Sequence, residues 1–536
     1  MKRLFSTTML VLFTAGSALA TGFHTRPEIN FSADTAISLV PVGTYESGAF
    51  DEGAAEIGAY DAGSKRLFVT NTNSNTVDIL SLRNIYKPRL KDSIDLSAYG
   101  GGVNSVAVKN GLVAVAVEAE TKQDPGKVVF FDIRGRYLNT VTVGALPDML
   151  TFTPDGLKVL VANEGEPNDE YTVDPEGTVS IIDLRYGVRP LNNDFVKEID
   201  FRAFNGADLA PIRIFGKNAS VAQDLEPEYI AVSADSSTAW VSLQENNALA
   251  IIDIASATVT KLVPLGTKDY SVIQNAIDAS NKDDAINIRP WPIVGMYQPD
   301  SIAAYEVDGE TYIVTANEGD SRDYDGFSEE ERVKDVDLDP DAYPDAEELQ
   351  KSENLGRLNI TTATGDFDDD GDFDLLHAYG GRSFSIRNAA GKLVYDSGSD
   401  FERLVAMVNP ENFNSTNDEN DSFDNRSDDK GPEPEGLTVG SIAGKTYAFI
   451  GLERDSGIMV YDITNPIAPQ FVQYINNRDF SGDAEAGTAG DLGPEGLVFI
   501  SAKDSPVQKP LLVVTNEISG TTTVYRIMTQ GPLKQH

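Results

Sequence analysis

Short apolar runs separated by polar turns dominate the chain. Residues 67–71 (LFVTN), 159–163 (VLVAN) and 312–317 (YIVTAN) each place apolar and β-branched residues directly before Asn. Runs of this length and composition are typical of β-strands. Helix signals are scarce, and residues 268–288 are the one stretch that we expect to be helical. The pattern therefore predicts an all-β fold.

The strand pattern repeats seven times. Each unit has an opening strand, a second strand, a turn and a third strand, and the seven openings read AEIGAY, VNSVAV, LPDMLTF, EPEYIAV, QPDSIAA, EPEGLTV and GPEGLVF. Several units add a fourth strand. Four antiparallel strands per unit, repeated seven times, indicate a seven-bladed β-propeller. The alternative, two sandwich domains, would not explain the sevenfold pattern.

The seventh unit lacks a fourth strand because the chain ends. Residues 36–46 (AISLVPVGTYE) resemble the fourth strand of unit four, residues 258–267 (TVTKLVPLGT). We therefore expect the N-terminal strand to close the ring as the missing outer strand, which removes exposed sheet edges. The propeller is then expected over residues 36–528, with a linker at 21–35 and a C-terminal tail at 529–536.

Residues 1–20 have the features of a secretory signal peptide. Lys2 and Arg3 form a basic start, Met9 to Phe13 form an apolar run, and Ala18 to Ala20 form a small-residue end. We expect cleavage after about Ala20 and a secreted or periplasmic protein. No later segment reaches about 18 uninterrupted apolar residues, so we expect no membrane span in the mature chain.

The excess of acids limits the partners. The chain has 84 Asp and Glu against 43 Lys and Arg, a formal net charge of −41. Nucleic acid is excluded as a partner because phosphate binding needs a basic surface. With no Cys and three His, disulfides, thiolate chemistry, a Ser-His-Asp triad and a His-rich zinc site are not expected. Divalent cations are the natural partners; the alternative is that the charge serves solubility alone.

Acids recur at two fixed places in the repeat. In a propeller the first strand starts and the second strand ends on one face, so both sets should meet at one mouth of the central channel. The first set is Glu56, Asp148, Glu228, Asp300, Glu435 and Glu495, and the second is Glu118, Glu164, Glu245, Glu318, Glu453 and Glu517.

A ring of this kind cannot stay both ionised and dry. Two carboxylates about 6 Å apart repel by roughly 3 kcal/mol at an effective dielectric near 20, so some acids must protonate, pair with Arg or Lys, or bind hard cations such as calcium or another divalent metal. The alternative is that they cap backbone N–H groups at strand ends, and we expect both kinds. The candidate metal ligands of the ring are Glu164, Glu318, Glu435, Glu453, Glu495 and Glu517.

Insertions interrupt the repeat near residues 165–177, 192–226, 268–290, 320–380 and 411–434. Several leave from the acidic face, and binding residues commonly lie in such loops. One insertion contains GDFDDDGDFD, in which Asp366, Asp368, Asp370 and Asp374 occupy positions 1, 3, 5 and 9 of a calcium loop. Position 12 is His377 where an EF-hand has Glu. We expect calcium here; the alternative is a solvated acidic turn.

Two arginines are candidates for binding an anion. Arg322 follows NEGDS, and Arg382 lies in GGRSFSI. Arginine grips phosphate or carboxylate through two parallel hydrogen bonds, and metal beside arginine is what a phosphate-ester site needs. The alternative is internal ion pairing with the acid ring.

Several motifs together resemble the choice-of-anchor I family over residues 30–528. They are VANEGE, TANEGD, GGRSFSI, DSGSDFE, DNRSDDKGPEPEGLTVG, LERDSGIMVYDI and GPEGL. The family includes mesenchyme-specific cell-surface glycoproteins of biomineralising animals and bacterial proteins often labelled alkaline phosphatases. The resemblance implies an extracytoplasmic propeller and assigns no catalytic residues.

Two functions remain open at this point. The first is an exported calcium-binding or metal-binding propeller that binds a ligand, a cell surface or a mineral at its acidic face. The second is a metal-dependent, alkaline phosphatase-like phosphomonoesterase, with Arg322 or Arg382 orienting the phosphate ester.

Overall fold

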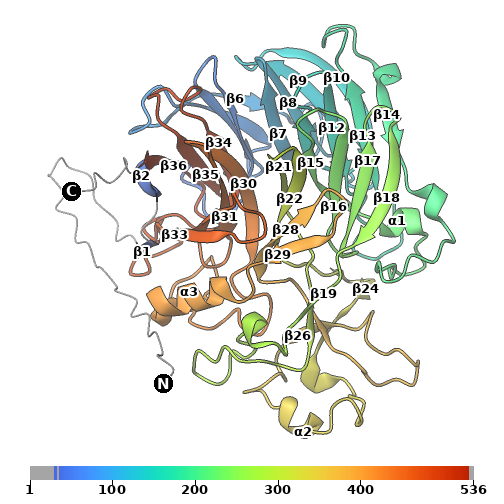
Figure 1. The fold of residues 1–536 in the computed structure, drawn as a ribbon. Coiled ribbons are helices and arrows are strands. Elements are labelled where there is room, and N and C mark those ends of the chain that lie inside the picture. The colour runs from blue at the N-terminus through green and yellow to red at the C-terminus, as the bar shows by residue number, and fades with distance from the viewer. Residues whose placement is uncertain (1–28, 33–35, 530–536) are drawn as a thin grey trace.

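Seven antiparallel sheets form a closed ring. The computed structural model describes residues 29–32 and 36–529, and the innermost strand of each sheet contacts the innermost strand of the next all the way round. Figure 1 shows the blades, coloured in chain order, around a common centre. The predicted seven-bladed β-propeller is therefore confirmed.

The first four blades follow the predicted repeat. Blade 1 comprises β3 (Gly58–Asp61), β4 (Arg66–Asn71), β5 (Thr76–Ser81) and β6 (Arg89–Asp95). Blade 2 comprises β7 (Val103–Lys109), β8 (Leu112–Val117), β9 (Pro125–Asp132) and β10 (Tyr137–Ala145). Blade 3 comprises β11 (Pro147–Phe152), β12 (Lys158–Asn163), β13 (Thr178–Asp183) and β14 (Val196–Ile199). Blade 4 comprises β15 (Pro227–Val232), β16 (Thr238–Leu243), β17 (Ala248–Asp253) and β18 (Thr258–Pro264).

The last three blades carry the long insertions and the ring closure. Blade 5 comprises β21 (Ile302–Val307), β22 (Glu310–Asn317), β28 (Ser383–Asn388) and β29 (Leu393–Asp396). Blade 6 comprises β30 (Pro434–Ile442), β31 (Lys445–Leu452), β32 (Gly457–Asp462) and β33 (Gln470–Asn476). Blade 7 comprises β34 (Pro494–Ile500), β35 (Leu511–Asn516), β36 (Thr521–Thr529) and the N-terminal β2 (Ile37–Glu46).

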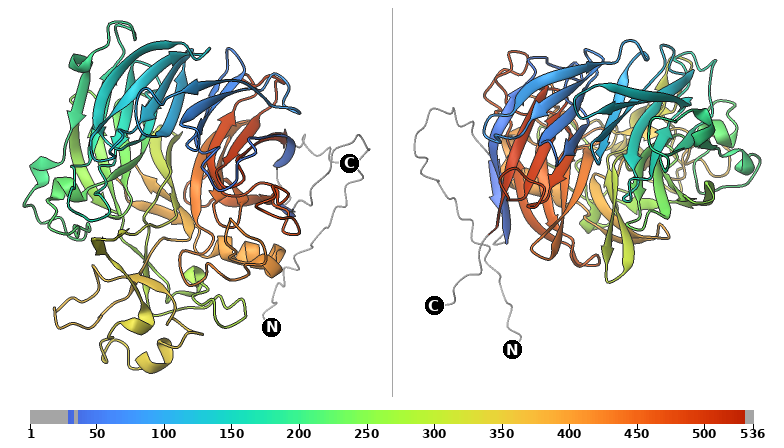
Figure 2. Two further views of the ribbon diagram at one scale, coloured as in Figure 1. Left: turned by 180° about the vertical axis from the view of Figure 1, so that it is seen from behind. Right: turned by 90° about the horizontal axis from the view of Figure 1, so that it is seen from above.

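The N-terminal strand closes the ring as predicted. β2 pairs antiparallel with β36, from Ile37 opposite Thr529 to Glu46 opposite Thr521, and Figure 2 shows this blue strand beside the red C-terminal strands. A second N-terminal strand, β1 (Ile29–Ser32), pairs with β33 and adds a fifth strand to blade 6. The sequence predicts a linker at residues 21–35, and residues 29–32 of it are instead a strand.

Apolar side chains fill the space between neighbouring blades. Seven of the hydrophobic clusters each join one blade to the next around the ring. The middle strands supply most of them, since strands such as β12 and β16 are buried on both faces, as expected for strands with neighbours on each side. The packing gives a rigid wall around the channel.

Two insertions, one between blades 4 and 5 and one between β22 and β28 of blade 5, together form a small unit with its own core. Its sheet contains β19 (Thr267–Asp269), β20 (Val294–Met296), β25 (Glu330–Arg332), β26 (Asn359–Thr361) and β27 (His377–Ala378), beside the hairpin of β23 (Asp323–Tyr324) and β24 (Phe327–Ser328). Trp291, Tyr343 and Leu358 are among its buried residues. In Figure 1 this unit lies together below the blades.

The prediction of a helix at residues 268–288 is wrong. That stretch contains part of β19, the 3-10 turn Ile273–Asn275 and an isolated bridge from Ile277 to Arg289. Its apolar residues do not form one helical stripe, since Tyr270, Ile277 and Ala279 belong to the core of this unit whereas Val272 and Ile273 are exposed. The helices of the described residues are α1 (Val221–Asp224), α2 (Ala346–Leu349) and α3 (Asp400–Val408).

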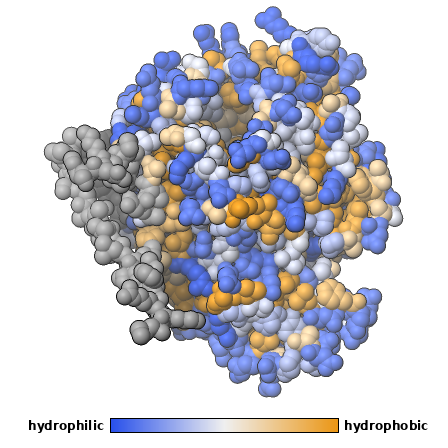
Figure 3. All heavy atoms as spheres, in the orientation of Figure 1, coloured by the Kyte–Doolittle hydropathy of each residue, from blue (hydrophilic) through white to orange (hydrophobic). Residues whose placement is uncertain are grey.

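Within residues 29–32 and 36–529, no helix has the length and hydropathy needed to cross a membrane. Figure 3 shows hydrophilic side chains spread over the face that it draws, with hydrophobic ones in separate groups. The signal peptide predicted at residues 1–20 lies outside the described residues, as does all but Thr529 of the predicted tail.

Candidate metal centre

The first set of acids points into the central channel because of the local strand geometry. Asp148, Glu228, Glu435 and Glu495 each directly follow a proline that opens the innermost strand. The pairing register with the second strand shifts at each of these positions. Bulges of this kind re-aim side chains, and proline is tolerated at the first residue of a strand because its missing N–H is not needed there.

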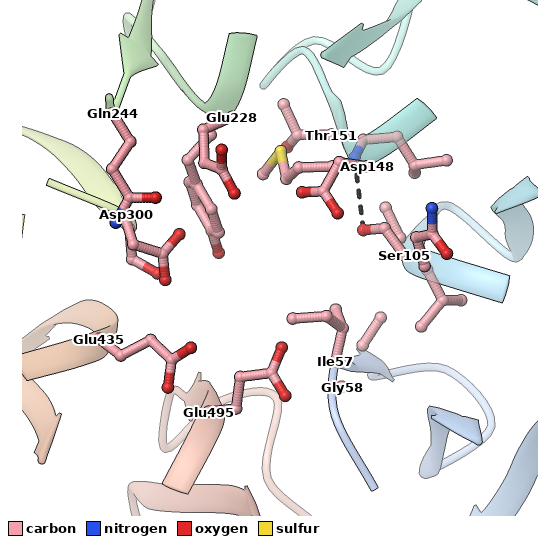
Figure 4. A pocket seen from close by; sticks show the side chains of 18 of the residues that line it. Ile57, Gly58, Ser105, Asp148, Thr151, Glu228, Gln244, Asp300, Glu435 and Glu495 are labelled. Carbon is pink, nitrogen blue, oxygen red and sulfur yellow. Dashed lines mark hydrogen bonds between the residues drawn. The ribbon is translucent and has the colours of Figure 1, made fainter. Parts of the chain in front are cut away.

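These acids line a cavity of about 510 Å³. Figure 4 shows the carboxylates of Asp148, Glu228, Asp300, Glu435 and Glu495 turned toward one opening, with Gln244 beside them. Asn104, which occupies the equivalent position in blade 2, also lines the cavity, and it donates a hydrogen bond to the Pro147 carbonyl oxygen over 3.2 Å.

The second set of acids meets the first at the same mouth. The residues combine into four groups, and within each group one carboxylate oxygen of every member lies within 4.8 Å of the others. Cluster A is Glu56, Glu495 and Glu517; cluster B is Glu164, Glu228 and Glu245; cluster C is Asp300, Glu318 and Glu435; cluster D is Glu318, Glu433 and Glu453. All six ring residues expected to bind metal therefore belong to one of these clusters.

Burial and mutual repulsion raise the pKa of most mouth acids. Burial, followed by the charge of Glu166, raises the pKa of Asp148 to about 7, and burial raises the pKa of Glu56 to about 7 as well. The pKa values of Glu228, Glu435 and Glu495 rise well above the ordinary value, first through burial and then through neighbouring carboxylates. Ionisation of these carboxyl groups therefore lowers the unfolding free energy of the protein.

Clusters A, B and C contain carboxylate oxygens that are out of contact with solvent and have no hydrogen-bond partner among the described residues. They are Oε2 of Glu228, Glu245, Glu435 and Glu495. Of these residues, Glu245 is only 5% exposed. Buried polar atoms are nearly always paired in folded proteins, so these four oxygens are candidates for contact with a proton, a water molecule or a bound ion.

Cluster D differs because cations of the chain itself neutralise it. Lys430 Nζ lies 2.8 Å from Glu318 Oε1 and 3.1 Å from Glu433 Oε2. Arg454 contacts Glu433 at 3.2 Å and Glu453 at 3.3 Å, and Arg426 contacts Glu433 at 2.7 Å. Burial alone would raise the pKa of Glu433, but these three cations lower it well below its ordinary value.

The two arginines proposed as anion ligands are engaged within the fold. Arg322 is 1% exposed, and it pairs with Asp224 at 2.7 Å and with Glu226 at 2.9 Å while its guanidinium lies over the Phe215 ring. Arg382 is 2% exposed, and its guanidinium donates to Glu402 and to backbone carbonyl oxygens that include those of Ser427 and Asp429. Both guanidinium groups hold insertions against the propeller.

The predicted calcium loop brings three of its four acids together. Carboxylate oxygens of Asp366, Asp368 and Asp374 lie within 4.8 Å of one another, and Asp366 Oδ1 is buried without a hydrogen-bond partner among the described residues. Asp370 raises the pKa of Asp368 through its charge, which places it nearby. The backbone turns at Gly371, which has φ +99°, and its N–H donates to Asp366 Oδ2 over 3.0 Å.

His377, at the twelfth position of that loop, is not part of the acidic group. Its ring packs edge-on against Phe367 at 6.4 Å between centroids, and its Nδ1 lies 3.1 Å from the Leu375 carbonyl oxygen. Burial lowers its pKa to about 4, so it is a neutral side chain of the core beneath the loop.

Sequence reasoning missed two acids of the mouth. Glu433 was not separated from the surrounding charges, although the sequence EPE occurs both at 226–228 and at 433–435, directly before an innermost strand. Asp320, the last residue of TANEGD, lines the cavity, and burial raises its pKa to about 8. The repeat of EPE and the acid that ends TANEGD were the available signals.

Comparison with known proteins gives a family match over most of the chain. The family model described as "Choice-of-anchor I domain" matches residues 56–466. Gigasin-3a of Magallana gigas is 33% identical over 190 residues, which cover 33% of this chain and 66% of that protein. The mesenchyme-specific cell surface glycoprotein of Strongylocentrotus purpuratus is 28% identical over 278 residues, which cover 45% of this chain and 35% of that protein. The chain thus spans less than two thirds of the length of these relatives.

Solved structures with a similar arrangement are distant in sequence. Hydrazine synthase of Kuenenia stuttgartiensis has a TM-score of 0.46 at 14% identity, covering 91% of this chain and 100% of that chain. A streptogramin B lyase has a TM-score of 0.45 at 10% identity, covering 92% of this chain and 98% of that chain.

Proposed function

This chain belongs to the choice-of-anchor I family, and we propose that it is an extracellular β-propeller that binds calcium ions at the mouth of its central channel. The extracellular assignment rests on the family and on the cell surface glycoprotein to which the chain is similar. The observation that carries the calcium assignment is the set of four unpaired carboxylate oxygens in clusters A, B and C.

Calcium suits this site better than a softer metal. The clusters offer only carboxylate oxygens, and calcium takes six to eight oxygen ligands in flexible geometry. Thiolates favour Cu(I) and iron–sulfur clusters and imidazole favours zinc and copper, whereas the clusters contain neither Cys nor His. Magnesium prefers stricter octahedral geometry and keeps several waters, so other divalent ions are competitors in the test rather than the first choice.

We assign a second calcium position to the loop of Asp366, Asp368 and Asp374, with Asp370 close by. Its support is the buried, unpaired Asp366 Oδ1 and the turn at Gly371. This loop belongs to the insertion, so it is separate from the mouth in sequence and in position.

Calcium at the mouth would also give the protein a way to hold a partner. An ion that keeps part of its coordination shell for outside ligands can bridge the acidic mouth to carboxylate or phosphate groups of a cell surface, a mineral or a phosphate ester. The phosphomonoesterase alternative has less support, because Arg322 and Arg382 are engaged by internal partners. We therefore propose binding rather than catalysis.

The test is calcium binding by the chelator-treated chain, measured by isothermal titration calorimetry and by thermal unfolding. We expect Glu228→Gln/Glu245→Gln to bind one calcium ion fewer than the unchanged chain. Glu310→Gln serves as a control, because Glu310 is an exposed residue at the opposite end of β22 from Glu318.

Two results would contradict the proposal. Equal calcium stoichiometry in the double variant and in the control would remove the mouth as a calcium site. Metal-dependent hydrolysis of a generic phosphate monoester that Glu318→Gln abolishes would replace binding with catalysis.

A further inference from the structure

Lys430 occupies cluster D in the way that a bound cation would. Its Nζ lies 2.8 Å from Glu318 Oε1, 2.8 Å from the Gly319 carbonyl oxygen and 3.1 Å from Glu433 Oε2. Three oxygens from two different segments therefore converge on one positive charge. Carboxylate and backbone carbonyl oxygens are also the ligands that calcium takes in proteins.

The unpaired oxygens of the mouth avoid this cluster. Both oxygens of Glu318 and of Glu433 have partners, and Glu453 Oε1 accepts a hydrogen bond from Asn417. Clusters A, B and C, by contrast, each contain at least one buried oxygen without a partner among the described residues. The difference follows the position of Lys430, because none of the ion pairs of the described residues involves Glu228, Glu435 or Glu495.

The turn that carries Lys430 is held against the insertion at residues 320–380. Asp428 pairs with Arg357 at 2.9 Å and with Arg332 at 3.5 Å, and its carbonyl oxygen accepts from the Asn359 N–H over 3.0 Å. The Lys430 side chain is 14% exposed. The contacts of this turn therefore fix the position of the Lys430 side chain at the mouth.

We infer that Lys430 is a built-in cation that fills cluster D and so confines calcium to clusters A, B and C. This inference rests on the proposed function, and it adds a statement about which sector of the mouth binds ions. Cluster C shares Glu318 with cluster D, so the same lysine also lowers the negative charge available to an ion beside Asp300 and Glu435.

The test replaces the lysine charge and counts ions. In Lys430→Met, Glu318, Glu433 and the Gly319 carbonyl oxygen lose their shared cation, so we expect the chain to bind one more calcium ion than the unchanged protein. Bound calcium per chain is measured by equilibrium dialysis against calcium chloride. Lys430→Gln removes the same charge and keeps a donor for the Gly319 carbonyl oxygen, so it provides the same readout if the methionine variant does not fold.

The matched control is Lys445→Met. Lys445 pairs with Asp462 at 2.7 Å and is 51% exposed, and it begins β31, whose far end leads into Glu453. The change in net charge is identical, but we expect no additional ion. Lys430→Arg, which keeps a cation in cluster D, should also leave the count unchanged.

The outcomes separate this inference from the proposed function. If the unchanged chain binds calcium and neither Lys430→Met nor Lys430→Gln gains an ion, Lys430 is a structural ion pair and the inference is overturned, while the proposed function stands. A gain in Lys445→Met equal to that in Lys430→Met would also overturn it, because the effect would then be one of net charge. If calcium binds neither to the unchanged chain nor to any of the variants, both proposals fail.

Discussion

Glu433 and Glu435 lie two residues apart, on either side of Pro434, and their surroundings are opposite. Glu433 is 0% exposed and accepts from Arg426, Arg454 and Lys430, which together lower its pKa. Glu435 points into the channel with one buried oxygen unpaired, and its pKa is raised well above the ordinary value by burial and then by neighbouring acids.

The difference shows that acidity alone does not define a site in this molecule. Acids such as Glu433 hold an insertion to the propeller through buried ion pairs. Acids such as Glu435 and Glu495 face one another without a cation from the described chain. The first group stabilises the fold at rest, whereas the second group lowers stability until protons or metal ions neutralise it.

The largest expected effect comes from making the same change at both positions. Glu433→Gln removes the charge that three buried cations share, and breaking such pairs typically costs about 3–5 kcal/mol of unfolding free energy. Glu435→Gln removes a repelled carboxylate, so we expect no loss, or a gain, in the presence of chelator at pH 8. Urea unfolding of the two variants measures the change in unfolding free energy for each. Equal destabilisation by the two substitutions would contradict the distinction between the two groups of acids.

The second prediction concerns the pH dependence of the chelator-treated protein. The Asp148 carboxyl has its pKa raised from 3.8 to about 7 in the folded protein. Well below pH 3.8 the Asp148 carboxyl is protonated in both the folded and the unfolded states, but as the pH rises toward 7 the unfolded state ionises first. The unfolding free energy should therefore fall over this range, by about 4 kcal/mol for Asp148 if it titrates alone.

Asp148→Asn removes this carboxyl together with its repulsion from Glu166 and Glu118. We expect the stability of the variant relative to the unchanged chain to increase from about pH 4 to pH 8, as measured by urea unfolding in chelator. Glu310→Gln, at the exposed start of β22, should follow the unchanged chain at every pH. Parallel curves for Asp148→Asn and the unchanged chain would mean that Asp148 does not carry the raised pKa.

The fold could be predicted from the sequence because each blade carries its own copy of the signal. The seven openings and the match between residues 36–46 and residues 258–267 were enough to place β2 beside β36. The insertion at 268–288 could not be assigned in this way, because it occurs once. Its apolar residues fit a helix by spacing, and only packing with Trp291 and Tyr343 makes them part of an irregular core.

The position of the candidate site could be predicted from the sequence, but the ion pairs of its acids could not. The repeat places acids at one mouth, since strand direction alone determines where they lie. Which acids receive a cation depends on residues outside the two repeated positions, such as Lys430 in an insertion and Arg454 in the turn between β31 and β32, whose distance to the ring depends on the tertiary fold. The same holds for Arg322, for which the sequence left anion binding and internal ion pairing open and which is buried against Asp224.

The smallest expected effect on stability concerns the acids of the loop at 366–374. They extend the comparison of Glu433 with Glu435 to acids that are exposed to water. Asp368 and Asp370 are exposed, so water already solvates their charge and an ion adds little to the stability of the whole chain. Extracellular calcium modules commonly have dissociation constants of about 10⁻⁴–10⁻³ M, which corresponds to about 1 kcal/mol of stabilisation at about 1 mM calcium.

Asp366→Asn should therefore remove one bound calcium ion while shifting the unfolding free energy in calcium by no more than about 1 kcal/mol. The matched control is Asp369→Asn, because Asp369 is exposed, has φ +59° and is not a member of the acidic group, and asparagine tolerates that backbone conformation. Calorimetric titration with calcium measures the count. A loss of stability as large as that of Glu433→Gln would show that the loop, like the buried ion pairs, holds the insertion in place, because a solvated loop has no means of transmitting the loss of one ion to the core.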